Sequence, residues 1–118
     1  MYIDGIILPV PEANEDAYKA MAAKVDPMFL EHGAIGVVEG WGSDIPKGEH
    51  TDFFKAVAAK EGETVVFSWI VWPSREARDK GWEAIMADDR MKNPGDMPFD
   101  GKRMFWGGFD CFLDLKAE

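Results

Sequence analysis

Glu39 is the residue whose type and position point most directly to chemistry. It lies in the segment AIGVVEGWG, residues 34–42, and alternates there with Val37 and Trp41, so the three would share one side of a strand. If that side faces an apolar interior, burial favours the protonated carboxyl, as a general acid or base requires. Glu39 is therefore the candidate base. Arg103, which opens the last apolar segment, is the candidate stabiliser of a developing anion.

Aromatic residues on the expected strands could form the walls of a ligand site. Asp52 directly precedes the Phe53–Phe54 pair and could line the same pocket. The side chains that could enclose an apolar or aromatic ligand are those of Trp41, Trp69, Trp72 and Trp106.

Both assignments have a structural alternative. Glu39 could pair with Arg103 or with a lysine at a sheet edge and only fix the strand register. Strand tryptophans could be core and interface anchors and not part of a binding site.

Other kinds of site have little support in the sequence. His32 and His50 match no metal-ligand spacing, so no metal is expected. Cys111 lies within an apolar segment, and Ser68 has no GxSxG context, so neither is expected to be a nucleophile. No glycine-rich phosphate-binding motif is present, and we expect no tightly held cofactor.

Charge and length set further limits. The chain has 118 residues, with 13 Lys and Arg against 22 Asp and Glu, a formal net charge of -9. This acidity argues against nucleic acid and against anionic membranes as partners, because both attract clustered basic side chains. The sequence has no apolar run of the roughly 20 residues that span a bilayer, and its first residues do not resemble a signal peptide. We therefore expect one cytoplasmic domain over residues 1–118.

The elements that would position these residues follow from hydrophobic periodicity. Residues 2–10, 34–42, 63–72 and 103–115 read as strands, and Gly107–Gly108 reads as a bulge or a point of close approach. Helices are expected from Asn14 to Gly33, with a bend at Pro27, and from Ser74 to about residue 91. A short helix is expected within residues 51–60, and residues 93–101 form a loop.

The order of these elements predicts the fold class. It is the ferredoxin-like α+β order βαββαβ, in which two helices cover one face of an antiparallel four-stranded sheet. The strand 63–72 is apolar on both sides. By alternation, Phe67 and Trp69 lie on one face, and Ile70 and Trp72 lie on the other. Helices can bury only one face. The other face therefore predicts a homodimer with two sheets packed together.

Several segments resemble a known family. The stretches YIDGIILPVP, EHGAIGVVEGWGSDIP, TDFFKAV, EGETVVFSWIVWPS and PFDGKRMFWGGF occur in this order and resemble the YbaA-like family of small bacterial proteins. The resemblance covers nearly the whole chain. It implies a dimeric α/β barrel of the ferredoxin-like type and assigns no biochemical activity.

Two functions follow as hypotheses. In the first, a homodimer binds a small apolar or aromatic metabolite, as a cofactor-independent monooxygenase or isomerase with Glu39 and Arg103 at its centre. In the second, the chain is a non-catalytic binding or interaction module whose aromatic sheet face serves only dimerisation. A cavity with convergent polar groups would favour the first, and a face filled to core density the second.

Overall fold

The computed structural model describes residues 1–92 and 97–117. Its sheet has the strand order β2-β3-β1-β4, and all neighbouring strands are antiparallel. The strands are β1 (Tyr2–Pro11), β2 (Gly36–Trp41), β3 (Glu63–Trp72) and β4 (Phe105–Asp110). The helices are α1 (Glu15–Val25), α2 (Pro27–Glu31), α3 (Phe53–Ala56), α4 (Arg75–Ala87) and α5 (Asp89–Lys92), with short 3-10 turns at Glu12–Asn14 and Gly101–Arg103.

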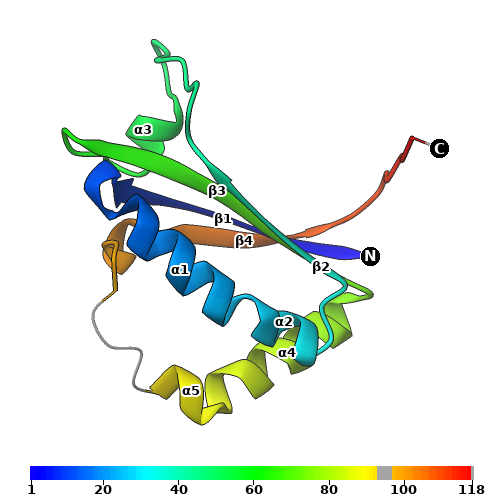
Figure 1. Cartoon of the computed structure of the whole chain (residues 1–118). Coiled ribbons are helices and arrows are strands. Elements are labelled where there is room, and N and C mark those ends of the chain that lie inside the picture. Colours follow the sequence, from blue (N-terminus) through cyan, green and yellow to red (C-terminus); the bar gives the residue numbers. More distant parts are fainter. Residues whose placement is uncertain (93–96, 118) are drawn as a thin grey trace.

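Helices α1, α2, α4 and α5 lie on one side of the sheet (Figure 1). We call the side of the sheet that meets them the inner face and the opposite side the outer face. This arrangement confirms the predicted ferredoxin-like α+β class. The central pair β1 and β3 is aligned over its full length, from Tyr2 opposite Trp72 to Pro11 opposite Glu63. No described helix is long and apolar enough to cross a membrane.

The core forms between the inner face and the helices, in two clusters. One surrounds Trp72 of β3, which is fully buried and packs edge-on against Phe29 of α2. The other joins Leu8 and Val10 of β1 to Tyr18 of α1 and Val66 of β3. Strand alternation delivers these residues to one side, as the sequence predicts for the face that the helices cover.

Two glycines provide space for this packing. A Cβ at Gly81 of α4 would collide with the Trp72 ring and lie 2.8 Å from the His32 carbonyl oxygen, so the helix can approach the sheet only with glycine there. A Cβ at Gly108 would lie 2.8 Å from the Arg78 guanidinium and would also collide with Tyr2. Of the two readings of Gly107–Gly108, close approach is correct. The bulge is wrong, because both glycines keep the regular register with β1.

The boundaries differ from the expected ones in physically understandable places. Pro27 divides the first predicted helix, since α1 ends at Val25 and α2 begins at Pro27. Asn14 does precede α1, but its side chain donates to the Pro98 carbonyl and caps no helical N–H. Ser74 caps α4 as predicted, because its hydroxyl accepts the Ala77 N–H at 3.0 Å. The last strand ends at Asp110, well before residue 115, and part of the predicted loop 93–101 lies outside the described residues.

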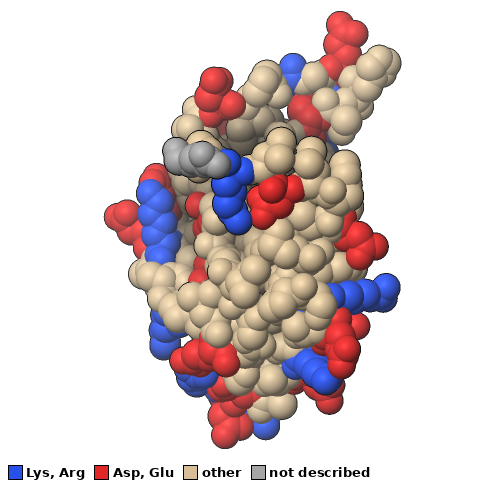
Figure 2. Space-filling model, turned by 90° about the vertical axis from the view of Figure 1, so that its right-hand side faces the viewer, with Lys and Arg blue, Asp and Glu red and all other residues tan. Residues whose placement is uncertain are grey.

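The outer face remains apolar and largely open. Large side chains at least two-fifths exposed occur on three of its strands, at Val38, Phe67, Phe105 and Phe109. The short helix α3 covers only one end, where Phe53 packs edge-on against Phe67 with the ring centroids 6.0 Å apart. A shallow apolar hollow of about 540 Å³ crosses this face between Trp69 and Phe109. Figure 2 views the end of the molecule where both termini lie, not the outer face itself, and shows charged side chains mostly around a broad uncharged area.

Candidate functional site

Two hollows flank helix α1. The inner cavity, about 670 Å³ in volume, lies between the helices and the inner face. The outer groove, about 640 Å³, runs between α1, α2 and the edge strand β2. Both are lined mostly by apolar side chains. The lining of the inner cavity includes five methionines: Met21, Met86, Met91, Met97 and Met104.

Polar side chains converge where the two hollows meet. Tyr18, Asp26 and Glu39 line both the inner cavity and the outer groove. Tyr18 and Asp26 are eight residues apart, which places them on the same face of a helix two turns apart. Glu39 faces them because alternation along β2 turns it to the inner face with Val37 and Trp41. We call Asp26 and Glu39 the carboxyl pair.

Hydrogen bonds and burial define the protonation of this group. The Tyr18 hydroxyl donates to Glu39 Oε1 at 2.6 Å, and Asp26 lines both hollows together with these two residues. Burial, together with the neighbouring Glu39 and its negative charge, raises the pKa of Asp26 to about 8. Burial and the same neighbours raise the pKa of Tyr18 above its ordinary value. At neutral pH Asp26 therefore holds a proton, and Tyr18 keeps its own.

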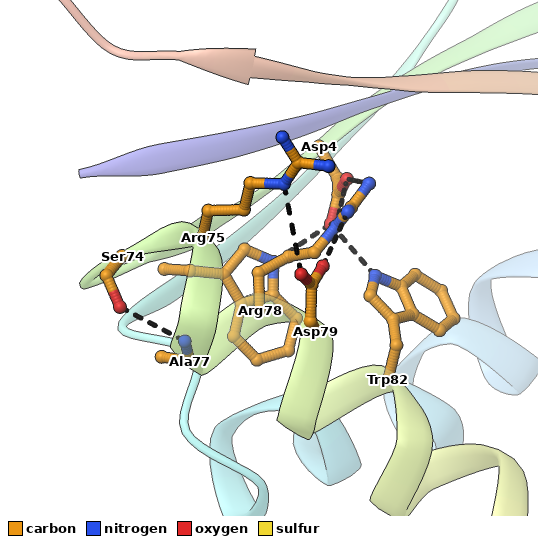
Figure 3. Close-up of polar contacts among 8 residues, drawn as sticks. Asp4, Ser74, Arg75, Ala77, Arg78, Asp79 and Trp82 are labelled. Carbon is orange, nitrogen blue, oxygen red and sulfur yellow. Dashed lines mark hydrogen bonds and ion pairs between the residues drawn. The ribbon is translucent and has the colours of Figure 1, made fainter.

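Asp4 on β1 is the third carboxylate beside the inner cavity, and it is more deeply buried than Asp26 and Glu39. It is 0% exposed and accepts indole N–H groups from Trp72 at 3.0 Å and Trp82 at 2.9 Å. Arg78 completes the cluster, with Nε 3.0 Å and Nη2 2.9 Å from Asp4 Oδ1. Figure 3 shows Arg78 and Trp82 reaching from α4 toward Asp4.

The contacts of Asp4 indicate a structural role for this carboxylate. The Arg78 guanidinium lies over the rings of Tyr2 and Trp106, 5.2 and 5.7 Å from their centroids, and hydrogen bonding to Asp4 raises its pKa. Both oxygens of Asp4 are engaged by donors and its charge is balanced. This cluster can hold β1, β3 and α4 together but has little capacity left for a ligand.

The aromatic residues singled out from the sequence do not gather in one place. Trp41 lines the outer groove, and Trp106, which is 62% exposed, lines the rim of the inner cavity. Trp72 is buried under the cavity wall, where its indole N–H is used by Asp4. Trp69 lies on the outer face with the apolar hollow.

Arg103 and Asp52 lie in other surroundings. Arg103 makes two hydrogen bonds to the Glu63 carboxylate, at 2.6 and 2.7 Å, and one to Asp100 at 3.0 Å. The guanidinium holds the pKa of the Glu63 carboxyl below its usual range. The structure therefore does not bring Arg103 to Glu39, either as an anion stabiliser or as a structural partner. Asp52 caps α3 by accepting the Lys55 N–H at 2.7 Å.

Sequence reasoning did not identify Tyr18, Asp26, Asp4 or Arg78. A signal existed for Tyr18 and Asp26, because polar groups eight residues apart share a helix face. Asp4 likewise alternates with Ile6 and Leu8 on an otherwise apolar strand. Within residues 1–92 and 97–117, no group of three or more His, Cys, Asp and Glu side chains is arranged to hold a metal ion.

Comparison with known proteins places the chain in a family. Residues 1–101 match the family described as "Protein of unknown function (DUF1428)". The chain belongs to this family. It is also 54% identical over 114 residues to "Uncharacterized protein YbaA" of Escherichia coli K12, covering 96% of this chain and 97% of that protein. The same identity and coverage hold for YbaA of Shigella flexneri. These findings confirm the resemblance stated from the sequence.

Solved structures support the fold. A MhuD mutant, described with two manganese protoporphyrin IX molecules bound per active site, superposes with a TM-score of 0.66 at 14% identity. A dimeric ferredoxin-like protein from an uncultured marine organism gives 0.59 at 10% identity. Each comparison covers 99% of this chain and 100% of the other. At these identities the likeness shows the fold alone, which is ferredoxin-like in this chain.

Proposed function

We propose that this protein binds a small apolar or aromatic ligand in the inner cavity and exchanges a proton with it through Glu39, as an isomerase does. The observation that carries the proposal is the position of Glu39: it is an acidic side chain on the wall of an apolar cavity, hydrogen-bonded by Tyr18 at 2.6 Å. A carboxylate placed in this way can accept a proton from a bound molecule.

The cavity itself supports binding. Its volume of about 670 Å³ lies within the roughly 300–1,000 Å³ common for small-molecule sites. Methionine side chains are flexible and polarizable, so a lining with five of them can adapt to flat or irregular apolar ligands. The MhuD mutant, which has the same fold, is described with two manganese protoporphyrin IX molecules bound per active site, so this fold can hold flat aromatic molecules.

The carboxyl pair favours proton transfer over simple binding. Asp26 holds a proton next to Glu39 at neutral pH, so a proton donor and a proton acceptor lie side by side on the cavity wall. Removal of a proton from one carbon and its delivery to another needs both functions. Of the two reactions considered from the sequence, isomerisation therefore fits this arrangement better than oxygen insertion.

The same proposal includes a homodimer formed through the outer face. Val38, Phe67, Phe105 and Phe109 expose apolar surface there. Their burial against a second copy would remove the patch from water. The fold neighbour from the uncultured marine organism is described as dimeric, which supports this use of the fold. The inner cavity lies on the other face and stays open in such a dimer.

A neutral aromatic probe tests the function. Allyl phenyl ketone isomerises to its conjugated form when a proton moves from the carbon beside the carbonyl to the terminal carbon, and ultraviolet absorbance follows the conversion. We expect the protein to accelerate it and Glu39→Gln to lower the rate by about 100-fold or more. Glu83→Gln, an exposed change on α4, is the matched control and should behave as the unmodified protein.

The alternative function is a non-catalytic interaction module. The apolar outer face is the observation that favours it. Equal probe conversion with the protein and with Glu39→Gln would refute proton transfer by Glu39. If the probe also failed to raise the melting temperature, the outer face alone would remain as a functional surface.

A further inference from the structure

The carboxyl pair separates two spaces that differ in their access to water. The inner cavity lies beneath the helices, whereas the outer groove opens beside the edge strand β2. Tyr18, Asp26 and Glu39 belong to the lining of both. A proton that moves through this wall would pass from one space to the other without opening the fold.

We propose that Asp26 is a proton relay, which exchanges the proton of Glu39 with water in the outer groove while the ligand occupies the inner cavity. This inference rests on the proposed function, because it concerns the fate of the proton that Glu39 takes from a ligand.

The position of Asp26 suits a relay. It lies at the break between α1 and α2, and its carboxyl caps no helix, so backbone N–H groups do not fix it as an acceptor. Among the described residues it makes no ion pair. Glu39 lines both hollows together with Asp26, and burial and that neighbour raise the pKa of Asp26. A carboxyl in this situation can hold a proton and also release it.

Tyr18 is suited to a different task. Its hydroxyl is buried, donates to Glu39, and keeps its proton because the pKa of Tyr18 is raised. It therefore orients Glu39 and does not carry protons onward.

Two of the three basic residues that line the hollows, Arg90 and Lys19, are paired with other carboxylates, and the third is Lys24. Arg90 is paired with Asp88 and Glu31, and Lys19 is paired with Glu15. The charged and titratable groups that line the hollows with Asp26 are Tyr18, Glu39, Asp4, Lys19, Lys24 and Arg90.

The steps balance without any further reactant. Glu39 takes a proton from the ligand carbon: a C–H bond breaks, an O–H bond forms, and the electron pair moves to the ligand's carbonyl oxygen. Asp26 gives its own proton to water in the groove and receives the proton of Glu39. Running in reverse, the relay returns a solvent proton to Glu39 and then to the new carbon. The product carries a proton from solvent and no electrons are gained or lost.

Deuterium content of the product tests the relay. We expect allyl phenyl ketone converted in D₂O by the unmodified protein to carry solvent deuterium at its new methyl group. Asp26→Asn keeps the shape and an N–H donor but removes the acidic proton. We expect slower conversion and about fivefold less deuterium per product molecule, because Glu39 then returns the substrate's own proton. Asp44→Asn, in an exposed loop, is the matched control and should match the unmodified protein.

A measurement on the protein alone completes the test. Carbon-13 NMR of the side-chain carboxyls should show Asp26 titrating above its ordinary pKa, and Glu39→Gln should lower the pH at which Asp26 titrates, because Glu39 is one cause of the raised pKa. Titration of Asp26 at its ordinary pKa would refute the relay, whether or not the probe is converted. Conversion that needs Glu39, with equal deuterium content in the product of Asp26→Asn, would refute the relay and leave the proposed function standing. Conversion that does not need Glu39 would refute the proposed function.

Discussion

Replacement of Asp26 by Asn should change how stability depends on pH. The pKa of Asp26 rises from its ordinary value of 3.8 to about 8 on folding. Between these values the folded protein binds a proton that the unfolded chain does not, so stability falls as the pH rises through this window. Asn cannot ionise and can donate an N–H to Glu39 at every pH. The variant should therefore gain stability relative to the unmodified protein as the pH increases.

The size of the effect follows from the degree of burial. When the folded protein binds one proton more than the unfolded chain, the free energy of unfolding falls by about 1.4 kcal/mol for each pH unit. Asp26 is only partly buried, and water screens its interaction with Glu39. We therefore expect the stability of Asp26→Asn relative to the unmodified protein to rise by about 1–2 kcal/mol between roughly pH 5 and pH 8.

Urea unfolding followed by tryptophan fluorescence at constant ionic strength measures this difference. Carboxyls whose pKa values are lowered, such as Glu63 and Asp52, lose their contribution only at more acidic pH and do not interfere. Asp44→Asn should show a pH-independent difference. A constant difference for Asp26→Asn across this range would refute the assignment of a proton to Asp26.

Four further changes test other parts of the structure. Asp4→Asn should lower the free energy of unfolding by about 3 kcal/mol, measured by urea unfolding, because it removes the buried carboxylate that pairs with Arg78 and leaves this arginine only the exposed Asp79. Gly81→Ala should cost roughly 1–3 kcal/mol in the same assay, since its Cβ would meet Trp72, and a neutral result would refute that contact. Light scattering should give twice the chain mass of 13.2 kDa, and Trp69→Asp on the outer face should return it to the monomer value. Arg103→Ala should lower the melting temperature but leave probe conversion unchanged, because its partners Glu63 and Asp100 lie outside the cavity lining.

The fold could be predicted because it depends on local periodicity. Alternation in residues 63–72 defines β3 to the residue, and Ser74 marks the start of α4. Alternation also separates the buried Ile70 from the exposed Phe67, which is why two apolar faces could be inferred from the amino-acid sequence alone. Such signals lie within a few residues of one another.

The candidate site depends on contacts between distant segments, which periodicity does not encode. Glu39 could be identified because it interrupts an apolar strand, but its partner Asp26 comes from the break between two helices. Asp4 and Arg78 are 74 residues apart. The same holds for Arg103: opposite charge alone suggested Glu39 as its partner, whereas the fold brings it to Glu63, 40 residues away in the sequence.

The four strands form a single layer, so the same backbone carries both the outer face and the wall of the hollows on the inner face. Val38 belongs to the outer face, while its neighbours Val37 and Glu39 line the hollows on the opposite side. Displacement of this backbone by a molecule on one side also moves what is presented on the other. Ligand binding and dimerisation would then be thermodynamically linked: a ligand that strengthens dimerisation by some factor would itself bind more tightly to the dimer by the same factor. Measurement of the dimer dissociation constant at several ligand concentrations would give this factor.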